Sequence, residues 1–310
     1  MRGGFAKKIG GTRERVSLSR VPKFKLHTAV EKLHEEGYSI SQLCRAAKMS
    51  RQAYYQYRKR SKCQRQKENE RVVETIIKIH YEEKGIFGYR MMQLHVNKEL
   101  KSHYNLKRIY RLMRLLGFQS VTRKKRKTYI LSPAQHTEEN LLNREFTADD
   151  MNEKWLTDIT EFEYGNKQKV YLCAILDLYD RSIVAYNLST RNDTNLVFDT
   201  VKDALNENPG ATPMIHSDRG FQFTSFGFKK IVEYYELKHS MSRVGCCLDN
   251  APMEGFWGKL KSEKYYLKDK YASHKELTDD IHDYIDFYNN RRLQRKLNAM
   301  APMEYRSLAS

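Results

Sequence analysis

The sequence predicts a mixed α/β domain in the second half of a 310-residue chain, preceded by helical segments. Up to about residue 118 the apolar residues recur at helical spacing, whereas from residue 154 stretches rich in β-branched and aromatic residues alternate with helical runs. Charge divides the chain at a similar place. Residues 1–140 hold 33 Lys and Arg against 12 Asp and Glu, and residues 141–310 hold 23 against 26. The net charge of +18 therefore originates in the helical half.

Composition narrows the class of function. A basic half favours binding to a polyanion, because Lys and Arg displace counterions from phosphates; a solvated, solubilising surface is the alternative. No run of about 18 apolar residues is present, and the start of the chain lacks the apolar centre of a signal peptide. The five cysteines form no CxxC pair, which argues against a zinc ribbon or a disulfide scaffold. We expect a cytoplasmic protein without a membrane partner.

The start of the chain predicts an arm followed by a helix-turn-helix. Residues 1–24 are rich in Gly, Ser and basic residues and indicate a flexible basic arm. Within residues 25–62, LHTAVEKLHEEG has helical spacing and stops at Gly37. Two short helices follow it, with predicted N-caps at Ser41 and Ser50. This layout is typical of a helix-turn-helix that binds DNA, although an ordinary helical hairpin has the same pattern.

The second helix of that unit is expected to contact bases. Arg51 and Gln52 lie in its first turn, where side chains reach base edges, and both can bond to a base in bidentate fashion. Arg58 lies further along the same basic helix. We interpret these three residues as DNA-binding.

Residues 65–122 predict a second helical DNA-binding unit. Its last helix, LKRIYRLMRLLG, has Asn105 as its N-cap and ends at Gly117. One face of this helix is predicted to be basic and the other apolar. The basic residues are Lys107, Arg108, Arg111 and Arg114, and the apolar ones are Ile109, Leu112 and Leu115. A basic tract, RKKRK, and a Pro-containing linker then occupy residues 123–148.

Residues 149–272 predict the α/β core, and residues 273–310 predict a C-terminal helix and tail. The expected order is three strands, a helix, a strand, a helix, a short strand and a helix, with a hairpin at the start. The strands lie in KWLTDITEFEY, QKVYLCAILDLYDRSIVAYNLS, PMIHSD and LKHSMS. This order predicts a mixed sheet covered by helices.

Three carboxylates of this core differ from the solvated acids on helix faces. Asp158 lies inside an apolar strand, where a charge is costly unless a metal or hydrogen bonds compensate it. Asp218 follows a short apolar strand at a Gly-containing turn, where open α/β sheets place their ligands. Glu254 lies near the start of a helix whose first turn contains Pro252. A capped turn or a buried ion pair could explain each one alone, but their conjunction behind a basic half indicates a site.

Carboxylate ligands of this kind suit Mg²⁺. Two ions about 3.5 to 4 Å apart can activate the attacking oxygen and stabilise the leaving one in phosphoryl transfer. We therefore interpret Asp158, Asp218 and Glu254 as catalytic residues that bind two Mg²⁺ ions, with Mn²⁺ able to substitute. Asn250 and Lys261 lie four residues before and seven after Glu254, which places all three roughly on one helix face. Both are interpreted as DNA-binding residues.

The segments KWLTDIT, HSDRGFQFTS and SRVGCCLDNAPMEGFWGKLKSE resemble those of the integrase-like DDE transposases of bacterial insertion sequences, the class made from two overlapping reading frames. Thirty-five residues separate the second acid from the third. GYRMMQLHVNKEL, KRIYRLMRLLGF and YNNRRLQRKLNAMAPMEY resemble flanking blocks of the same class. The likeness extends over about residues 38–306.

This resemblance implies a ribonuclease-H-like catalytic core preceded by all-α, helix-turn-helix-type DNA-binding segments. It implies that Asp158, Asp218 and Glu254 are the metal-binding triad and that Lys261 contacts DNA. The implied reaction is hydrolysis at an element end, followed by attack of the freed 3′-OH on another phosphodiester. The implied partners are double-stranded DNA, as terminal inverted repeats and target, and at least one further copy of the chain. The resemblance further implies that the protein is associated with the bacterial nucleoid.

The chain departs from this class in two places. Gln294 stands where a histidine is usual, and the first twenty-five or so residues match no block of the class. Without the heptads of a leucine zipper, the chain is interpreted as a downstream-frame product, and a product with an unusual front is the alternative. Two other functions stay open: a catalytically unproductive regulator that binds element ends, and a plain ribonuclease-H-type nuclease. The intact triad favours the enzyme, and the long basic region argues against the plain nuclease.

Overall fold

The structure, a computed structural model, describes residues 23–59, 63–122, 138–243 and 247–309. The chain divides into two compact units, Met1–Arg71 and Val72–Ser310. The predicted basic arm lies almost wholly outside the described residues, and so does the RKKRK tract. No helix within the described ranges is long and apolar enough to cross a lipid bilayer. The finer division of the chain into six segments stays a prediction.

The first unit packs three helices on a small core. They are α2 (Lys23–Glu35), α3 (Ile40–Ala46) and α4 (Arg51–Lys59). Val30, Cys44 and Tyr54 are buried between them. Gly37 has a φ of +95° and follows the end of α2 as predicted, because a residue without a Cβ adopts this conformation freely.

One of the two predicted caps in this unit is confirmed. The Ala53 amide donates a hydrogen bond to Ser50 Oγ at 3.1 Å, so Ser50 caps α4. The predicted cap at Ser41 is wrong, because α3 already begins at Ile40 and has Ser39 at its N-cap position. Ile40 packs on the core of the unit, and this contact explains why the helix starts earlier.

Three longer helices follow: α5 (Gln64–Glu82), which crosses the boundary between the units, α6 (Tyr89–Glu99) and α7 (Leu106–Leu116). Asn105 Oδ1 accepts a hydrogen bond from the Lys107 amide at 2.9 Å, and Gly117 has a φ of +72°, so both predicted ends of α7 are confirmed. The predicted apolar face of α7 was partly wrong. Leu115 is 65% exposed, whereas Met113 is 3% exposed and joins Ile109 in the core. Met113 lies four residues after Ile109, and that spacing keeps a residue on one helix face.

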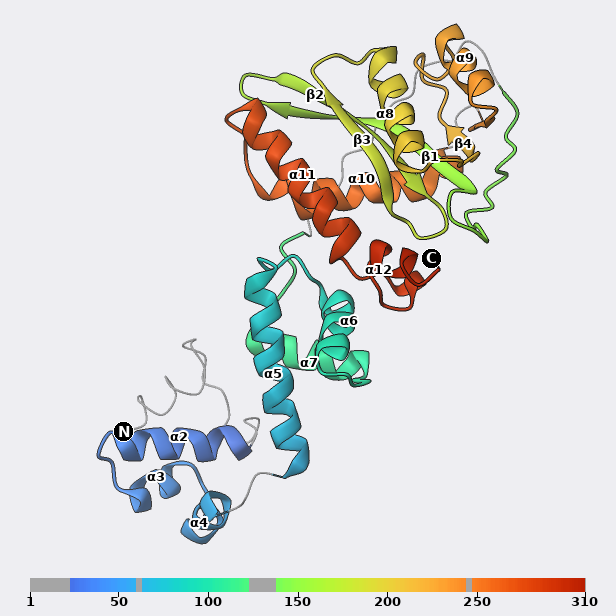
Figure 1. Cartoon of the computed structure of the whole chain (residues 1–310). Coiled ribbons are helices and arrows are strands. Elements are labelled where there is room, and N and C mark those ends of the chain that lie inside the picture. The colour runs from blue at the N-terminus through green and yellow to red at the C-terminus, as the bar shows by residue number, and fades with distance from the viewer. Residues whose placement is uncertain (1–22, 60–62, 123–137, 244–246, 310) are drawn as a thin grey trace. The chain divides into compact units, whose positions relative to one another are not determined.

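A five-stranded mixed sheet forms the core of the second unit (Figure 1). The strands are β1 (Lys154–Tyr164), β2 (Gln168–Asp177), β3 (Ile183–Ser189), β4 (Met214–Ser217) and β5 (Lys238–Met241), in the spatial order β3-β2-β1-β4-β5. The first three strands pair antiparallel, and β4 pairs parallel to both β1 and β5. The predicted strand segments and the mixed sheet are confirmed.

Helices cover both faces of this sheet (Figure 1). On one face lie α8 (Thr194–Glu207) and α9 (Phe226–Tyr234), and on the other lie α10 (Ala251–Glu263) and α11 (His274–Asn290). Shorter helices are η2 (Cys247–Asn250), η3 (Tyr265–Leu267), η4 (Arg295–Leu297) and α12 (Pro302–Arg306). Because side chains alternate along a strand, β1 contributes to both cores: Trp155 packs on the α8 side and Leu156 on the α10 side. This is the ribonuclease-H-like arrangement expected for the core.

Candidate active site

Asp158 and Asp218 lie beside each other because their strands are neighbours. In the parallel pair of β1 and β4, Leu156 is opposite His216. Two residues further along each strand the same register places Asp158 beside Asp218, at the spacing of adjacent strands. Both acids, together with Gln222, line one cavity at this end of the sheet.

Asp158 points to the α10 side of the sheet. It lies two residues after Leu156 and four before Phe162, and both of those side chains belong to the core on that side. Trp257 Nε1, on α10, donates a hydrogen bond to Asp158 Oδ2 at 3.0 Å. The Ile159 amide donates to Oδ1 at 2.8 Å. Both carboxylate oxygens of Asp158 therefore already accept one hydrogen bond.

The helix α10 carries Glu254 and Lys261 on the same stripe as Trp257. Glu254 lies three residues before Trp257 and Lys261 four residues after it, which is the spacing of one helix face. Glu254 is exposed in the first turn. Lys261 is half-buried, with Nζ 5.2 Å from the centroid of the Phe162 ring, and burial lowers its pKa. Trp257, which was not among the predicted site residues, thus links this face of α10 to β1.

The acids are held together at an electrostatic cost. Burial is the main cause that raises the pKa of Asp158, and the charges of Asp218 and Glu254 raise it further against the lowering effect of its hydrogen bonds. Burial also raises the pKa of Asp218, whose Oδ1 accepts a hydrogen bond from the Gly220 amide at 2.8 Å. A bound cation would offset the repulsion among these carboxylates.

The donor set suits a hard divalent cation, but it is not assembled as a coordination sphere. Two carboxylates come from adjacent strands and a third from the facing helix, and carboxylate oxygens are the ligands that Mg²⁺ prefers. In the part of the chain that the structure describes, no group of three or more His, Cys, Asp or Glu side chains has the geometry to hold a metal ion. Metal binding by Asp158, Asp218 and Glu254 therefore stays a prediction.

Comparison with known proteins identifies the family. Residues 148–247 and 254–309 match the family described as Integrase core domain, and residues 67–126 match the HTH-like domain family. The chain is 38% identical over 272 residues to the InsK protein of insertion sequence element IS150 from Escherichia coli K12, covering 87% of this chain and 94% of that protein. The chain belongs to the insertion-sequence transposases.

A second sequence relative agrees with this assignment. The transposase of insertion sequence element IS904 from Lactococcus lactis is 32% identical over 245 residues, covering 77% of this chain and 95% of that protein. The HTLV-2 integrase catalytic core domain, solved in complex with magnesium, is 19% identical with a TM-score of 0.40, and covers 50% of this chain and 95% of its own. The likeness to that structure is weak and adds nothing to the assignment, which rests on the sequence relatives.

The integrase core makes this transposase an enzyme of the polynucleotidyl-transferase type, and its HTH-like domain implies DNA binding. That domain match falls on the second predicted helical unit rather than on residues 25–62. DNA binding by residues 25–62 therefore stays a prediction.

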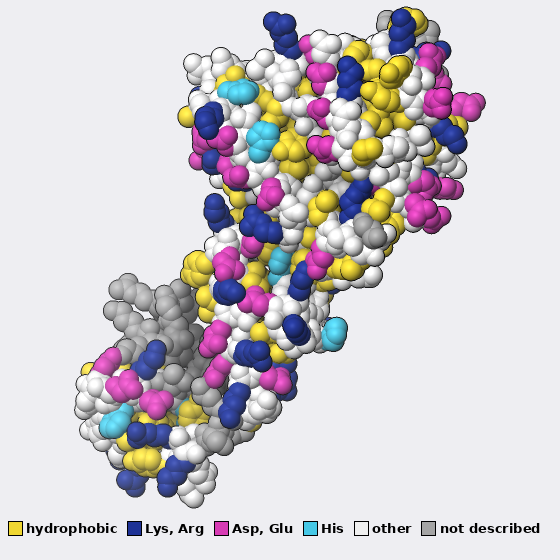
Figure 2. All heavy atoms as spheres, in the orientation of Figure 1, with side chains coloured by type: hydrophobic (Ala, Val, Ile, Leu, Met, Phe, Trp, Pro, Cys, Tyr) yellow, Lys and Arg dark blue, Asp and Glu magenta, His cyan; other side chains and the backbone are white. Residues whose placement is uncertain are grey.

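The predicted DNA-contact residues of the transposase are mostly exposed. On α4 these are Arg51, Gln52 and Arg58, and on α7 Lys107 and Arg111. Arg108 is half-buried, with its guanidinium carbon 4.8 Å from the centroid of the Tyr104 ring. On the face drawn in Figure 2, basic and acidic side chains are interspersed rather than gathered in one basic patch. Their contacts with DNA stay predictions.

Asn250 lies in the interior instead. Only 5% of this residue is exposed, and its Nδ2 donates a hydrogen bond to the Thr157 carbonyl oxygen at 3.3 Å. The helix α10 begins after it, at Ala251, so Asn250 does not share the exposed face of Glu254. The structure gives this side chain a role in joining α10 to β1, and any contact with DNA stays a prediction.

Among the glycines that the structure describes, Gly220 is the one at which an added methyl group would contact Asp218. A Cβ there would lie 3.0 Å from Asp218 Oδ1 and 2.9 Å from Gln222 Oε1. Gly220→Ala is therefore expected to displace Asp218 and to lower the transposition frequency by at least about tenfold, as ångström-scale misplacement at a reaction centre does. The frequency is measured in a mating-out assay.

Gly255→Ala is the matched control for this substitution. A Cβ at Gly255 meets no heavy atom within 4 Å, and alanine favours a helix over glycine by about 0.5 to 1 kcal/mol. This variant should keep its activity and gain stability. Equal activities of the two variants would contradict the prediction that a methyl group at residue 220 displaces Asp218 from its working position.

Proposed function

We propose that this transposase cuts DNA at the ends of its insertion sequence and joins the freed strand to another phosphodiester, using Mg²⁺ held by Asp158, Asp218 and Glu254. The observation that carries this proposal is the placement of Asp158 beside Asp218 on neighbouring strands, with α10 packed against β1 and bonded to Asp158 through Trp257. A protein that only binds DNA has no need for three repelling acids at one sheet end.

The chemistry is two in-line displacements at phosphorus. Water first attacks the phosphodiester at the element end, the bond to the 3′ oxygen breaks, and the departing oxygen takes a proton. The resulting 3′-OH then attacks a second phosphodiester and displaces its 3′ oxygen in the same way. When bound, two Mg²⁺ ions would supply charge that activates the attacking oxygen and stabilises the leaving one.

Residues of the chain itself have distinct tasks in this proposal. Asp158, Asp218 and Glu254 hold the cations, and Mn²⁺ can replace Mg²⁺. Trp257 fixes the orientation of the Asp158 carboxylate through its hydrogen bond. Lys261, on the same stripe of α10, contacts the phosphate beside the scissile bond.

The remaining parts of the transposase recognise DNA and assemble on it. Residues 25–62 and 65–122 bind the terminal inverted repeats, with base contacts from Arg51 and Gln52 of α4. Two ends must be brought together, so at least two copies of the chain act on one DNA complex. Such a complex would be associated with the bacterial nucleoid.

Strand cleavage and joining with purified protein tests the proposal. A labelled duplex copied from the DNA that flanks the gene should be nicked and joined in Mg²⁺ or Mn²⁺ and stay intact in EDTA. Asp158→Asn should remove both products while DNA binding, measured by fluorescence anisotropy, is retained. Asp199→Asn is the matched control, because Asp199 is an exposed acid on α8, across the sheet from α10.

The main competing function is that of a regulator that binds element ends without catalysis. The same assay separates the two functions. Binding to the end duplex without any cleavage in either metal would favour the regulator. Joining that persists unchanged in Asp158→Asn would instead overturn the proposed role of Asp158 in catalysis.

A further inference from the structure

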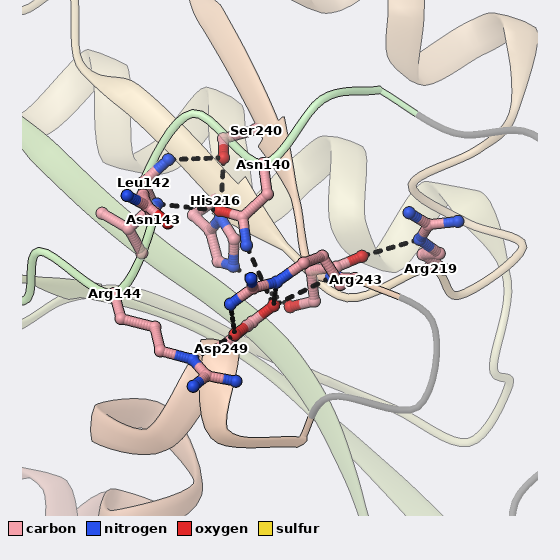
Figure 3. A network of polar contacts seen from close by, with 10 residues as sticks. Asn140, Leu142, Asn143, Arg144, His216, Arg219, Ser240, Arg243 and Asp249 are labelled. Carbon is pink, nitrogen blue, oxygen red and sulfur yellow. Dashed lines mark hydrogen bonds and ion pairs between the residues drawn. The ribbon is translucent and has the colours of Figure 1, made fainter.

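A buried carboxylate next to the candidate active site holds two arginines at once. Asp249, fully buried, accepts hydrogen bonds from Arg144 Nε at 2.6 Å and from Arg243 Nε and Nη2, both at 2.9 Å (Figure 3). The Arg243 amide and Asn140 Nδ2 also donate to it, at 3.0 and 2.9 Å. The hydrogen bonds from Arg243 and Arg144 hold the pKa of Asp249 well below its usual range, so the carboxylate stays charged.

A third arginine belongs to the same cluster. Arg219 Nε donates a hydrogen bond to the carbonyl oxygen of Ser242 at 2.6 Å, and Ser242 immediately precedes Arg243 (Figure 3). Two guanidinium groups therefore meet at the Asp249 carboxylate, and a third is bonded to the backbone next to Arg243. We call Arg144, Arg219 and Arg243 the arginine cluster.

The arginine cluster is more than a structural ion pair. Arg144, Arg219 and Arg243 contribute three positive charges and Asp249 one negative charge, so these four side chains carry a net charge of +2. The side chains of Arg144 and Arg243 remain 42% and 47% exposed. Arg144 and Arg219 are tethered through Nε, and no other described residue bonds to their terminal Nη groups. These Nη donors are thus fixed in position and open to a ligand.

The position of the arginine cluster matches that of the proposed acids. Arg219 directly follows Asp218, and Asp249 lies in η2, five residues before Glu254. The segment that supplies Arg144 is anchored to the same end of the sheet, because the Leu142 amide donates a hydrogen bond to Ser240 Oγ at 3.1 Å. The arginine cluster therefore borders the sheet end that carries the acids.

We propose that the arginine cluster binds backbone phosphates of the DNA strand that enters the candidate active site, with Asp249 as the residue that positions two of the arginines. This inference rests on the proposed function and adds a phosphate-binding site to it. Guanidinium groups match the geometry of phosphate oxygens in a fork, and fixing them beforehand reduces the entropy lost on binding. Contacts of this kind fix the register of the DNA without reading its sequence.

Salt dependence of DNA binding tests the arginine cluster. The full chain is titrated by fluorescence anisotropy, without divalent cations, against a duplex of the element end at several salt concentrations. Each lost phosphate contact should reduce the slope of log K against log salt by about 0.9. Arg144→Gln and Arg219→Gln should each show this reduction, and the double variant about twice as much. Lys202→Gln, which removes an exposed charge from α8, should leave the slope unchanged.

Three outcomes are informative. Slopes equal to that of the wild type in both Gln variants would overturn the inference. A reduction of the same size in Lys202→Gln would also overturn it, because the effect would then follow net charge alone. If Arg219→Gln shows no thermal unfolding transition, it does not fold, and Arg144→Gln and Arg219→Lys are tested instead. Arg219→Lys should keep most of the salt dependence of the wild type. Because these measurements need no cleavage, their result is independent of the Asp158→Asn assay.

Discussion

Asp218→Asn is expected to abolish strand joining and, at the same time, to make the metal-free protein more stable at pH 8. The loss of activity follows from the proposed function, since charge stabilisation by a bound metal contributes several kcal/mol and about 1.4 kcal/mol corresponds to a factor of ten in rate. We expect a fall of at least about a hundredfold. The gain in stability follows from the metal-free geometry. Asn retains an oxygen for the Gly220 amide but removes the charge that raises the pKa of Asp158.

The pH dependence of this gain has a definite sign. A carboxyl group whose pKa is raised on folding lowers the stability of the folded state at any pH above its unfolded pKa of about 4. The wild type should therefore lose stability as the pH rises from about 4 through the raised pKa of Asp158. Asp218→Asn should lose less stability over the same pH range. The melting temperatures of the wild type and the variant should therefore differ most near pH 8 and become similar near pH 4.

Thermal unfolding of both proteins in EDTA, from pH 4 to pH 8, measures this difference. Mn²⁺ provides a second readout, because a ligand that binds only the folded state raises its melting temperature. The wild type should gain stability with Mn²⁺, and Asp218→Asn should gain little. A variant that is no more stable than the wild type at pH 8 would show that the two acids do not interact as the structure indicates.

Arg306→Ala is expected to destabilise the second unit by roughly 3 to 5 kcal/mol, the usual loss when one partner of a buried ion pair is removed. Arg306 Nη1 donates to Asp177 Oδ2 at 3.1 Å and to Asp180 Oδ2 at 2.6 Å. Its Nη2 donates to Asn152 Oδ1 and to Asn208 Oδ1, both at 2.9 Å. Both aspartates are fully buried, so the substitution leaves two carboxylates without their cation.

Urea unfolding followed by circular dichroism measures this loss. Arg295→Ala is the matched control, because Arg295 is exposed and its Nη2 donates a 3.3 Å hydrogen bond to the uncharged Gln93 Oε1. It should change the free energy of unfolding by under about 0.5 kcal/mol. Arg306→Lys should fall between the two, since lysine keeps the charge but cannot reach four oxygens in a planar fork. A loss of under about 1 kcal/mol in Arg306→Ala would show that the ion pairs of Arg306 stabilise the fold no more than ordinary surface ion pairs do.

Local features of the fold could be predicted because their causes lie within a few residues. The caps at Ser50 and Asn105 and the end of α7 at Gly117 are set by a side chain and the amides next to it. The buried face of α7 also has a local cause, because Met113 lies four residues after Ile109 on one helix face, whereas Leu115, which was predicted to be apolar and buried, lies off that face and is exposed. Ser41 was misplaced for another reason, since packing of Ile40 on the core extends α3.

The candidate site was only partly predictable. The acids could be selected from their contexts, but no local pattern says that β4 pairs with β1 and brings Asp218 beside Asp158. Trp257 carried a weak signal, because it lies three residues after Glu254 on the same helix. Asn250 was selected by helical spacing, yet the helix begins after it.

The sequence by itself determined the helices and strands, the separation of a basic helical half from an α/β half, and the ordered blocks that place the chain among insertion-sequence transposases. Only the tertiary structure decided which distant residues meet: Trp257 with Asp158, Arg144 with Asp249, and Arg306 with the Asp177 turn. The physical reason is the distance along the chain over which each interaction acts. Backbone preferences and caps depend on near neighbours, whereas strand order and buried ion pairs join residues about a hundred positions apart, and packing of the whole core selects among them.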